Sequence, residues 1–149
     1  MTLRKLLTQK GYHRIKLILT KTNHFEVRTI LNDVEGNFIV DTGASNSCVG
    51  FEAVEKFNLF TQDSDVKAAG AGATDMLTQL SEKNSIQVGN WSSKRISLIL
   101  FDLKHVNAAL IAHQAEPVDG IIGADILKKG KAIIDYERKC LYLKQTTKH

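Results

Sequence analysis

The chain has 149 residues, of which 43% are hydrophobic and 24% charged, and its formal net charge is +4. This length suits one domain with a real core, and no apolar stretch is long enough to span a bilayer. Since nothing can span a bilayer, we expect no membrane partner. Basic residues are scattered among acidic ones and form no run dense enough to follow a phosphate backbone, so we expect no nucleic acid as a partner.

Histidine and cysteine usage points away from a metal site. The five histidines are dispersed and the two cysteines, Cys48 and Cys140, lie far apart, so we expect no metal and no cofactor. The basic N-terminus lacks the apolar core of a signal peptide, which favours a cytoplasmic protein with reduced thiols. We expect Cys48 to be a small buried hydrophobic residue at the start of a helix rather than a nucleophile.

The N-terminal residues predict a short amphipathic helix. Leu3, Leu6 and Leu7 have helical spacing, Thr2 can cap the start, and Gly11 can end the helix. We accordingly expect a helical extension at residues 1–12, a main domain at residues 13–143 and a polar tail at residues 144–149.

Most of the main domain is predicted to be β structure with a few short helices. Alternating apolar residues predict strands at 15–20 and 24–31, and a turn at 32–36 leads into a short apolar strand at 38–40. The later elements are a short helix or turn at 51–57, a hairpin at 64–80, two strands around a turn at 89–90, a helix at 104–113, a strand at 118–122, a helix at 124–128, and closing strands at 132–136 and 140–143.

The most informative segment directly follows the strand at 38–40. It is Asp41-Thr42-Gly43-Ala44-Ser45, and its Asp-Thr-Gly occurs only once. A carboxylate at the end of a buried strand is held by the core and can face a cleft. Gly43 permits a tight turn that brings amide groups toward the carboxylate, and the Thr42 hydroxyl can donate a hydrogen bond that fixes the loop. The alternative is that Asp41 only caps a turn or the next helix.

Two further motifs accompany this loop. Val118-Asp119-Gly120-Ile121-Ile122-Gly123-Ala124 places apolar residues and a glycine before a short helix, and the glycine-rich run Ala68-Ala69-Gly70-Ala71-Gly72-Ala73 lies between the two. In order and spacing the three motifs resemble the retropepsin-like aspartic proteases, over roughly residues 13–143. We expect Asp119 and Asp125, which adjoin the strand-to-helix turn, to cap it rather than to act as a second acid.

The resemblance implies an all-β acid-protease barrel with one lobe per chain. It implies a catalytic role for Asp41 and support of the active-site loop by Thr42 and Gly43. The residues that it implies as contacts of a polypeptide substrate are Ala44 and the tip of a flap over the cleft, Gly70, Ala71 and Gly72. For the flap segment, a plain hairpin without a functional role is the alternative.

The single copy of the loop bears on the assembly. Aspartic proteases hold a water between two carboxylates that share one proton, because two like charges so close together cannot both ionise. One Asp-Thr-Gly supplies only one of these carboxylates, so the resemblance implies a homodimer in which each chain contributes Asp41 to a site on the twofold axis. A protein with two fused lobes would need a second copy, which the chain lacks.

Some features depart from the viral members. Viral retropepsins usually carry an arginine, part of an ion-pair network, where this chain has Ala124. The N-terminal helix, the helix at 104–113 and the polar tail are additions, and the pattern is closer to cellular and bacterial members. Two other functions stay open: a retropepsin fold that does not cleave and serves as a dimerisation or peptide-binding module, and a monomeric β domain whose Asp-Thr-Gly is coincidental.

Overall fold

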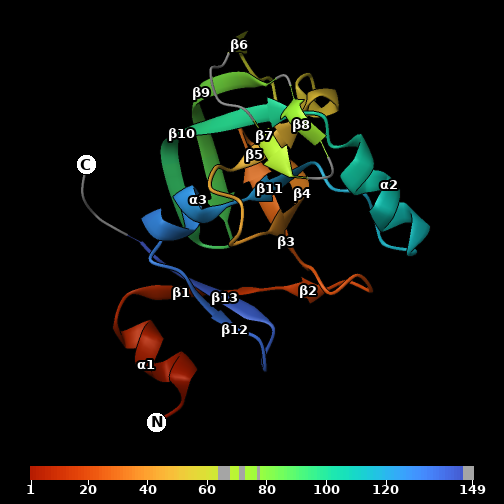
Figure 1. Cartoon of the computed structure of the whole chain (residues 1–149). Helices are drawn as coiled ribbons and strands as arrows, with labels where there is room; N and C mark the ends of the chain where they lie inside the picture. Colours follow the sequence, from red (N-terminus) through yellow and green to blue (C-terminus); the bar gives the residue numbers. More distant parts are fainter. Residues whose placement is uncertain (64–67, 71–72, 77, 146–149) are drawn as a thin grey trace.

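The computed structural model describes residues 1–63, 68–70, 73–76 and 78–145. The fold is mainly β with short helices, which confirms the predicted class (Figure 1). The helical elements are α1 (Leu3–Gln9), the 3-10 turn η1 (Phe51–Ala53), α2 (Lys104–Ala112) and α3 (Ala124–Lys129). The strands are β1 (Tyr12–Lys16), β2 (Ile18–Leu19), β3 (Phe25–Leu31), β4 (Val34–Val40), β5 (Cys48–Gly50), β6 (Gln62–Asp63), β7 (Ala68–Gly70), β8 (Ala73–Met76), β9 (Gln79–Val88), β10 (Trp91–Phe101), β11 (Gly120–Ile122), β12 (Ile133–Asp135) and β13 (Cys140–Lys144).

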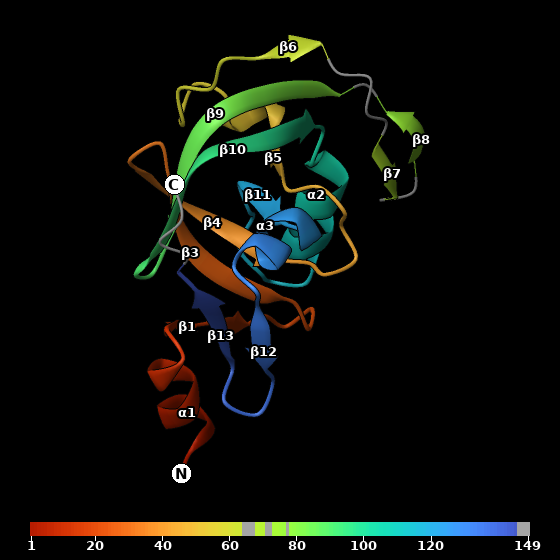
Figure 2. The ribbon, with the colours of Figure 1, turned by 90° about the vertical axis from the view of Figure 1, so that its left-hand side faces the viewer.

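Six strands of the larger sheet close into a ring. The strand order is β2-β3-β4-β11-β5-β10-β9-β6, and β3 also pairs with β9. This extra pairing, of Ile30 with Gln87 and of Leu31 with Ile86, joins the two ends of the run from β3 to β9 into a barrel. In Figure 2 the long strands β9 and β10 curve over one side of the ring. The core is filled by large apolar side chains that each expose 2% or less, among them Phe38, Phe57, Ile86, Trp91, Leu98 and Leu100.

A three-stranded sheet, in the order β1-β13-β12, lies beneath the barrel in Figure 1. Its inner face, with Ile15, Leu141 and Leu143, belongs to the same apolar core as the barrel. Its outer face carries Cys140 and Tyr142, and Leu7 of α1 packs against them. The predicted helices at the N-terminus, at 104–113 and at 124–128 are confirmed. None of the helices in the described part of the chain is both long enough and apolar enough to cross a membrane.

The strand predicted at residues 15–20 is wrong as a single element. β1 ends at Lys16 and β2 begins at Ile18, and the two strands belong to different sheets. Leu17 lies between them with a buried side chain, and its amide donates a hydrogen bond to the Lys139 carbonyl at 3.0 Å. The change of sheet leaves the alternation of the sequence intact, which is why the pattern does not reveal it.

The turn before β4 is shorter than the predicted turn at residues 32–36. Asn32 and Asp33 form it alone, with φ of 50° and 67°, and β4 begins at Val34. Asn and Asp tolerate the left-handed conformation that a two-residue hairpin turn requires. Gly36 therefore lies inside the strand, where the Phe57 ring packs so closely that a Cβ would lie 2.6 Å from it.

Cys48 is buried, as predicted, but it lies in β5 and not at the start of a helix. Its strand pairs with β10 on one side and β11 on the other. Burial raises the pKa of the Cys48 thiol to about 12, so the thiol stays protonated near neutral pH. Cys48 therefore acts as a small hydrophobic residue and not as a nucleophile.

The hairpin predicted at residues 64–80 is present where the structure describes it. β7 pairs with β8 in antiparallel fashion, with Ala68 opposite Met76 and Gly70 opposite Ala73. Ala71 and Gly72 lie outside the described residues. In Figure 2 the hairpin projects to one side of the barrel.

Candidate active site

Asp41 stands where β4 leaves the barrel. β4 runs parallel to β11, and the Asp41 amide donates to the Ile122 carbonyl at 2.9 Å, which continues that pairing by one residue. The backbone of the candidate acid is thus anchored to the second motif. Asp41 itself is exposed in the single chain, as are Thr42 and Gly43.

A tight turn orients the Asp41 carboxylate. The Gly43 amide donates to Asp41 Oδ1 at 2.9 Å, and the Ala44 amide donates to the Asp41 carbonyl at 3.2 Å. A Cβ at position 43 would lie 3.2 Å from Asp41 Oδ1, so any larger residue there would crowd the carboxylate. Within the described residues of one chain, the Thr42 hydroxyl has no hydrogen-bond partner.

The start of α3 packs directly against this loop. The Ala124 amide donates to the Ala44 carbonyl at 2.7 Å. A Cβ at Gly123 would lie 2.5 Å from that same carbonyl oxygen and 3.0 Å from the Asn46 carbonyl. Two backbone segments are in contact here, and only a glycine at position 123 leaves enough space between them.

A buried serine ties the far end of the loop to α3. The Ser47 side chain and amide both donate to the Asp125 carboxylate, at 2.6 Å from Oγ and 3.0 Å from the amide to Oδ1. Ser47 Oγ in turn accepts from the Gly123 amide at 2.8 Å. Ser47 exposes only 1% of its surface and its bond to the Gly123 amide is buried, whereas Asp125 is exposed, so the group lies at the edge of the core.

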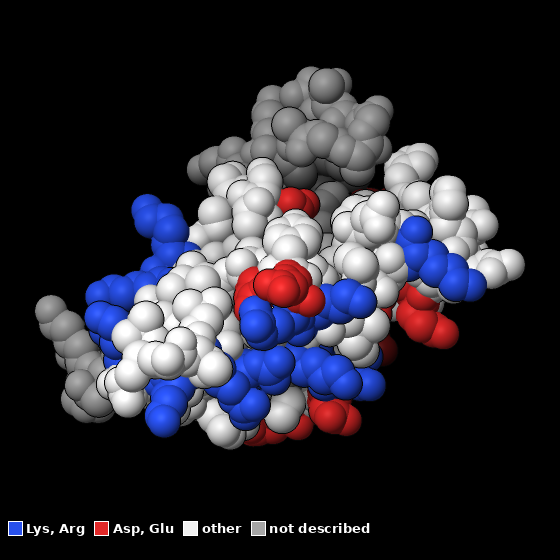
Figure 3. Space-filling model, turned by 90° about the horizontal axis from the view of Figure 1, so that it is seen from below, with Lys and Arg blue, Asp and Glu red and all other residues white. Residues whose placement is uncertain are grey.

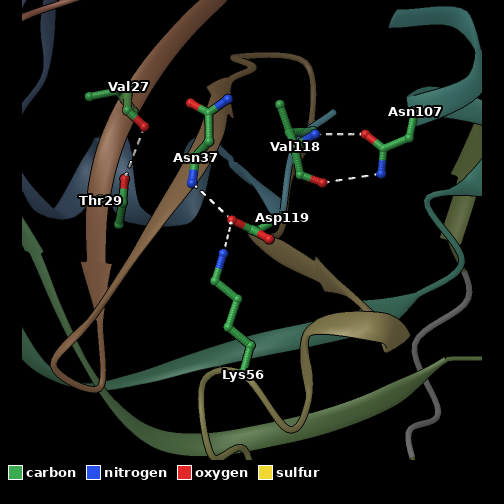
Figure 4. Close-up of polar contacts among 7 residues, drawn as sticks. All are labelled: Val27, Thr29, Asn37, Lys56, Asn107, Val118 and Asp119. Carbon is green, nitrogen blue, oxygen red and sulfur yellow. Dashed lines mark hydrogen bonds and ion pairs between the residues drawn. The ribbon is translucent and has the colours of Figure 1, made fainter. Parts of the chain in front are cut away.

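Asp119 and Asp125, the two acids of the second motif, make contacts that differ from the predicted caps. Asp125 does not cap α3, whose N-cap is Gly123 without a side-chain cap: it lies in the first turn of the helix, accepts from the Ile126 amide and binds Ser47. Asp119 does not cap α3: its Oδ2 accepts from the Asn37 amide at 3.0 Å and from Lys56 Nζ at 2.9 Å (Figure 4). The prediction that Asp119 caps α3 is wrong. Asp119 lies immediately before β11, and its side chain faces the neighbouring strand β4.

Sequence reasoning missed Ser47 altogether. Its partners lie more than seventy positions away, and no local pattern links a serine after the loop to an acid in a later helix. The only available signal is that Ser47 is a polar residue immediately before the apolar strand β5.

Replacing Ser47 with alanine should lower the free energy of unfolding by about 2 kcal/mol, because it leaves the buried Gly123 amide without an acceptor. Thermal or urea unfolding measures this effect. Ser45→Ala is the matched control, because Ser45 is exposed, and it should change stability by less than about 0.5 kcal/mol. Equal stability of the two variants would contradict the bracing role of Ser47.

An apolar cavity of about 370 Å³ lies beside the strand that ends at Asp41. Ile39 lines it and stands two residues before Asp41 in the sequence. Helix α2 forms the opposite wall. The lining residues are Thr22, His24, Ile39, His105, Val106, Ala109 and Leu110.

Two side chains of helix α2, Asn107 and Leu110, attach it to the rest of the site. Asn107 Nδ2 donates to the Val118 carbonyl at 3.1 Å, and Asn107 Oδ1 accepts from the Val118 amide at 2.7 Å (Figure 4). Leu110 of the same helix packs against Ile39 and Val118. The cavity wall is therefore fixed to both motifs of the site.

A second, more open hollow of about 570 Å³ adjoins the loop on its other side. Thr42 borders it, together with Ala124 and Leu127 of α3 and Ile134 of β12. Among the described residues, no three His, Cys, Asp or Glu side chains lie where they could hold a metal ion together. The arrangement thus presents one oriented carboxylate, an apolar cavity on one side of it and an open hollow on the other.

Comparison with known proteins agrees with this geometry. The family model described as aspartyl protease matches residues 27–126, which is more than half of the chain. No curated protein sequence matches the chain.

Solved structures share the fold. A complex of EIAV protease with the inhibitor HBY-793 aligns with a TM-score of 0.56 and 20% identity, over 74% of this chain and 90% of the other. A retropepsin-like aspartic protease from Rickettsia conorii aligns with a TM-score of 0.55 and 21% identity, over 89% of each chain. The retroviral protease-like domain of Ddi1 from Leishmania major gives 0.52 and 20%, over 79% of this chain and 86% of the other. At these identities the likeness concerns the fold, which is that of a single retropepsin-like lobe.

Proposed function

Because this chain belongs to the aspartyl protease family, we propose that it is an endopeptidase whose water is activated between two Asp41 carboxylates, one from each chain of a homodimer. The observation that carries the proposal is the single oriented carboxylate. Asp41 is anchored by β11 and by the Gly43 amide, yet it is exposed, and among the described residues of the same chain no second carboxylate is hydrogen-bonded to it.

The proposed chemistry needs the two carboxyl groups in different protonation states. One, ionised, takes a proton from the water as the water attacks the peptide carbonyl, and the other, protonated, donates its proton to the carbonyl oxygen. The intermediate then collapses as the amine leaves with a proton. The Gly43 amide supports this by fixing one oxygen of Asp41 and leaving the other free to face the water.

The exposed active-site loop of a single chain and the hollow beside it support the homodimer. Asp41, Thr42 and Gly43 are all exposed, and the hollow of about 570 Å³ beside Thr42 offers space for a second chain. We propose that Thr42 and Gly43 support the loop. The residues that we propose as contacts of the substrate backbone are Ala44 and the hairpin tip, Gly70, Ala71 and Gly72.

The protease domain is proposed to span residues 13–143, with a helical extension before it and a polar tail after it. We also propose that the protein acts in the cytoplasm, where its two buried cysteines, Cys48 and Cys140, remain thiols.

The direct test is cleavage of an unfolded polypeptide between about pH 4 and about pH 7, measured over a range of protein concentrations. Activity per chain should rise with concentration until the dimer is saturated. A dimer that binds peptides without cleaving them would instead favour the module that does not cleave. A protein that stays monomeric and inactive would favour the coincidental Asp-Thr-Gly.

The cavity beside Ile39 is proposed to receive an apolar side chain of the substrate. Ala109→Trp should fill much of it and lower cleavage at sites with large apolar side chains by about tenfold or more. Ala108→Trp is the matched control, because Ala108 is also exposed on α2 but does not line the cavity. Cleavage of a mixed peptide library, read by mass spectrometry, measures the preference. An unchanged preference in Ala109→Trp would exclude this cavity as a substrate site.

A further inference from the structure

Charge is divided unevenly along this chain. Residues 1–20 and 128–149 together hold twelve Lys or Arg and two acidic residues, whereas residues 21–127 hold eight Lys or Arg and fourteen acidic residues. The two terminal segments therefore carry a net charge of +10 and the central segment −6, within a total of +4. The terminal basic residues are separated in sequence by more than one hundred positions.

The fold brings the two terminal segments together. β1 pairs with β13 from Tyr12–Lys144 to Lys16–Cys140, and β12 completes the small sheet. Alternation along β1 and β13 places Arg14 and Lys16 on the outer face with Tyr142, opposite to buried Ile15. α1 packs on that same face and adds Arg4 and Lys5. We call this surface, formed by α1 and the outer side of the sheet β1-β13-β12, the terminal face.

The terminal face is rich in unpaired cations. Viewed from below, Lys and Arg side chains run across it and acidic side chains form smaller patches (Figure 3). Arg138 pairs with Asp135 and Glu137. Among the described residues of the two terminal segments, no other Lys or Arg is in an ion pair. Its exposed cations include Arg4, Lys5, Lys10, Arg14, Lys16 and Lys139.

Large apolar side chains are exposed beside these cations. Met1 exposes 82% of its surface, Leu3 41% and Leu6 39%, although all three belong to or precede the short helix α1. Only Leu7 of that helix is buried, against Cys140 and Tyr142. α1 is thus anchored by one leucine and presents the others to solvent, next to Arg4 and Lys5.

We propose that the terminal face binds the surface of a membrane that contains anionic lipid. Basic residues adsorb to such a surface, and adjacent apolar side chains enter the headgroup region, so the two features reinforce each other. A nucleic acid would use the cations but give the exposed Met1, Leu3 and Leu6 nothing apolar to enter. A second copy of the chain placed face to face would bring the exposed cations of both terminal faces together, which electrostatic repulsion opposes.

Sequence reasoning excluded a membrane partner because no apolar stretch can span a bilayer, and it assigned the cations to no surface because they are scattered along the chain. They become a surface only when β1 and β13 pair, which links residues at opposite ends of the sequence. The acidic central segment then lies on the side of the molecule away from the lipid, so adsorption would have a preferred orientation.

Co-sedimentation with lipid vesicles tests the proposal. The full chain should bind vesicles with about 30% phosphatidylserine in phosphatidylcholine, should not bind phosphatidylcholine alone, and should be released as NaCl rises from about 0.1 M to about 0.5 M. The double variant Arg4→Gln, Lys5→Gln should bind about 25-fold more weakly, as expected for the loss of two charges near an anionic surface. Lys94→Gln, Arg95→Gln is the matched control on β10 of the barrel, and its binding should change little.

The apolar contribution has a separate readout. Leu3→Ser, Leu6→Ser should weaken binding to the anionic vesicles about tenfold at about 0.1 M NaCl, although every charge is retained, and the thermal unfolding transition should be kept because Leu7 still anchors α1. Equal binding to both kinds of vesicle would overturn the proposal. It would also be overturned by tighter binding to a DNA oligonucleotide than to anionic vesicles at the same salt, or by a change in the monomer–dimer equilibrium in either terminal variant. None of these outcomes depends on peptidase activity.

Discussion

Replacing Asp41 with asparagine should lower the rate of peptide cleavage at least about a thousandfold. The asparagine amide cannot take the proton of the attacking water, and in the proposed dimer the substitution removes both carboxylates at once. The fold should be unaffected, because an asparagine oxygen can still accept from the Gly43 amide and the backbone bond to Ile122 does not involve the side chain. The measurement is the initial rate on an unfolded polypeptide at matched protein concentration.

Asp33→Asn is the matched control for this substitution. Asp33 is also exposed, and its left-handed turn conformation suits asparagine as well as aspartate. This variant should cleave at the wild-type rate. If Asp41→Asn cleaved as fast as Asp33→Asn, the assignment of Asp41 as the catalytic acid would have to be abandoned.

Mixing the two forms tests whether one site needs two chains. When wild type and Asp41→Asn are combined in equal amounts and allowed to exchange, only dimers with two wild-type chains should be active, so about a quarter of the full rate should remain. A site complete in one chain would instead retain about half. The two outcomes are distinguishable by simple rate measurement, with Asp33→Asn in place of Asp41→Asn as the control mixture.

Replacing Gly123 with alanine should have the largest effect on structure and activity together. The new Cβ would lie 2.5 Å from the Ala44 carbonyl oxygen, and both are backbone-fixed, so the active-site loop or α3 must move. Overpacking of this kind costs about 3 kcal/mol, which for a chain of this size lowers the melting temperature by roughly 6 to 12 °C. A displacement of Asp41 by even about 1 Å should reduce kcat about a hundredfold in the protein that remains folded.

Gly50→Ala is the control for that substitution. Its Cβ would lie 3.4 Å from Leu103 Cδ1, a flexible side-chain atom, so the melting temperature should fall by only a few degrees and cleavage should persist. Calorimetry and cleavage rates would be measured on both variants at a temperature where both are folded. Full activity of Gly123→Ala would show that α3 does not position the loop.

Short-range features of the site could be predicted from the sequence, and long-range ones could not. The turn after β4 follows from Gly43, two residues from the acid whose carboxylate its amide contacts. By contrast, the bonds between Ser47 and Asp125 span 78 positions, and the one local bond of Asp125, from the Ile126 amide, does not point to Ser47. A prediction from spacing had no means to select this pair among the many polar residues of the chain.

The same distinction holds for the fold. Alternation placed most strands, because a half-buried strand requires it locally. It did not reveal that β3 pairs with β9 to close the ring, or that the chain changes sheets at Leu17, since neither event changes the alternation. The predicted turn at 32–36 is longer than the observed one, because a glycine such as Gly36 is typical of a turn. Here the close packing of Phe57 is what requires a glycine.

The contacts that anchor the loop have a consequence for the time at which an active site can exist. The Asp41 amide bonds to Ile122 of β11, and Ser47 bonds to Asp125 of α3, so these bonds can form only after β11 and α3, respectively, have left the ribosome. Tyr12 finds its partner Lys144 later still. Contacts of such high sequence separation form slowly and late in folding. A nascent chain therefore carries Asp41 without an ordered active-site loop until the later motif has been made, so it is not a working protease before that point.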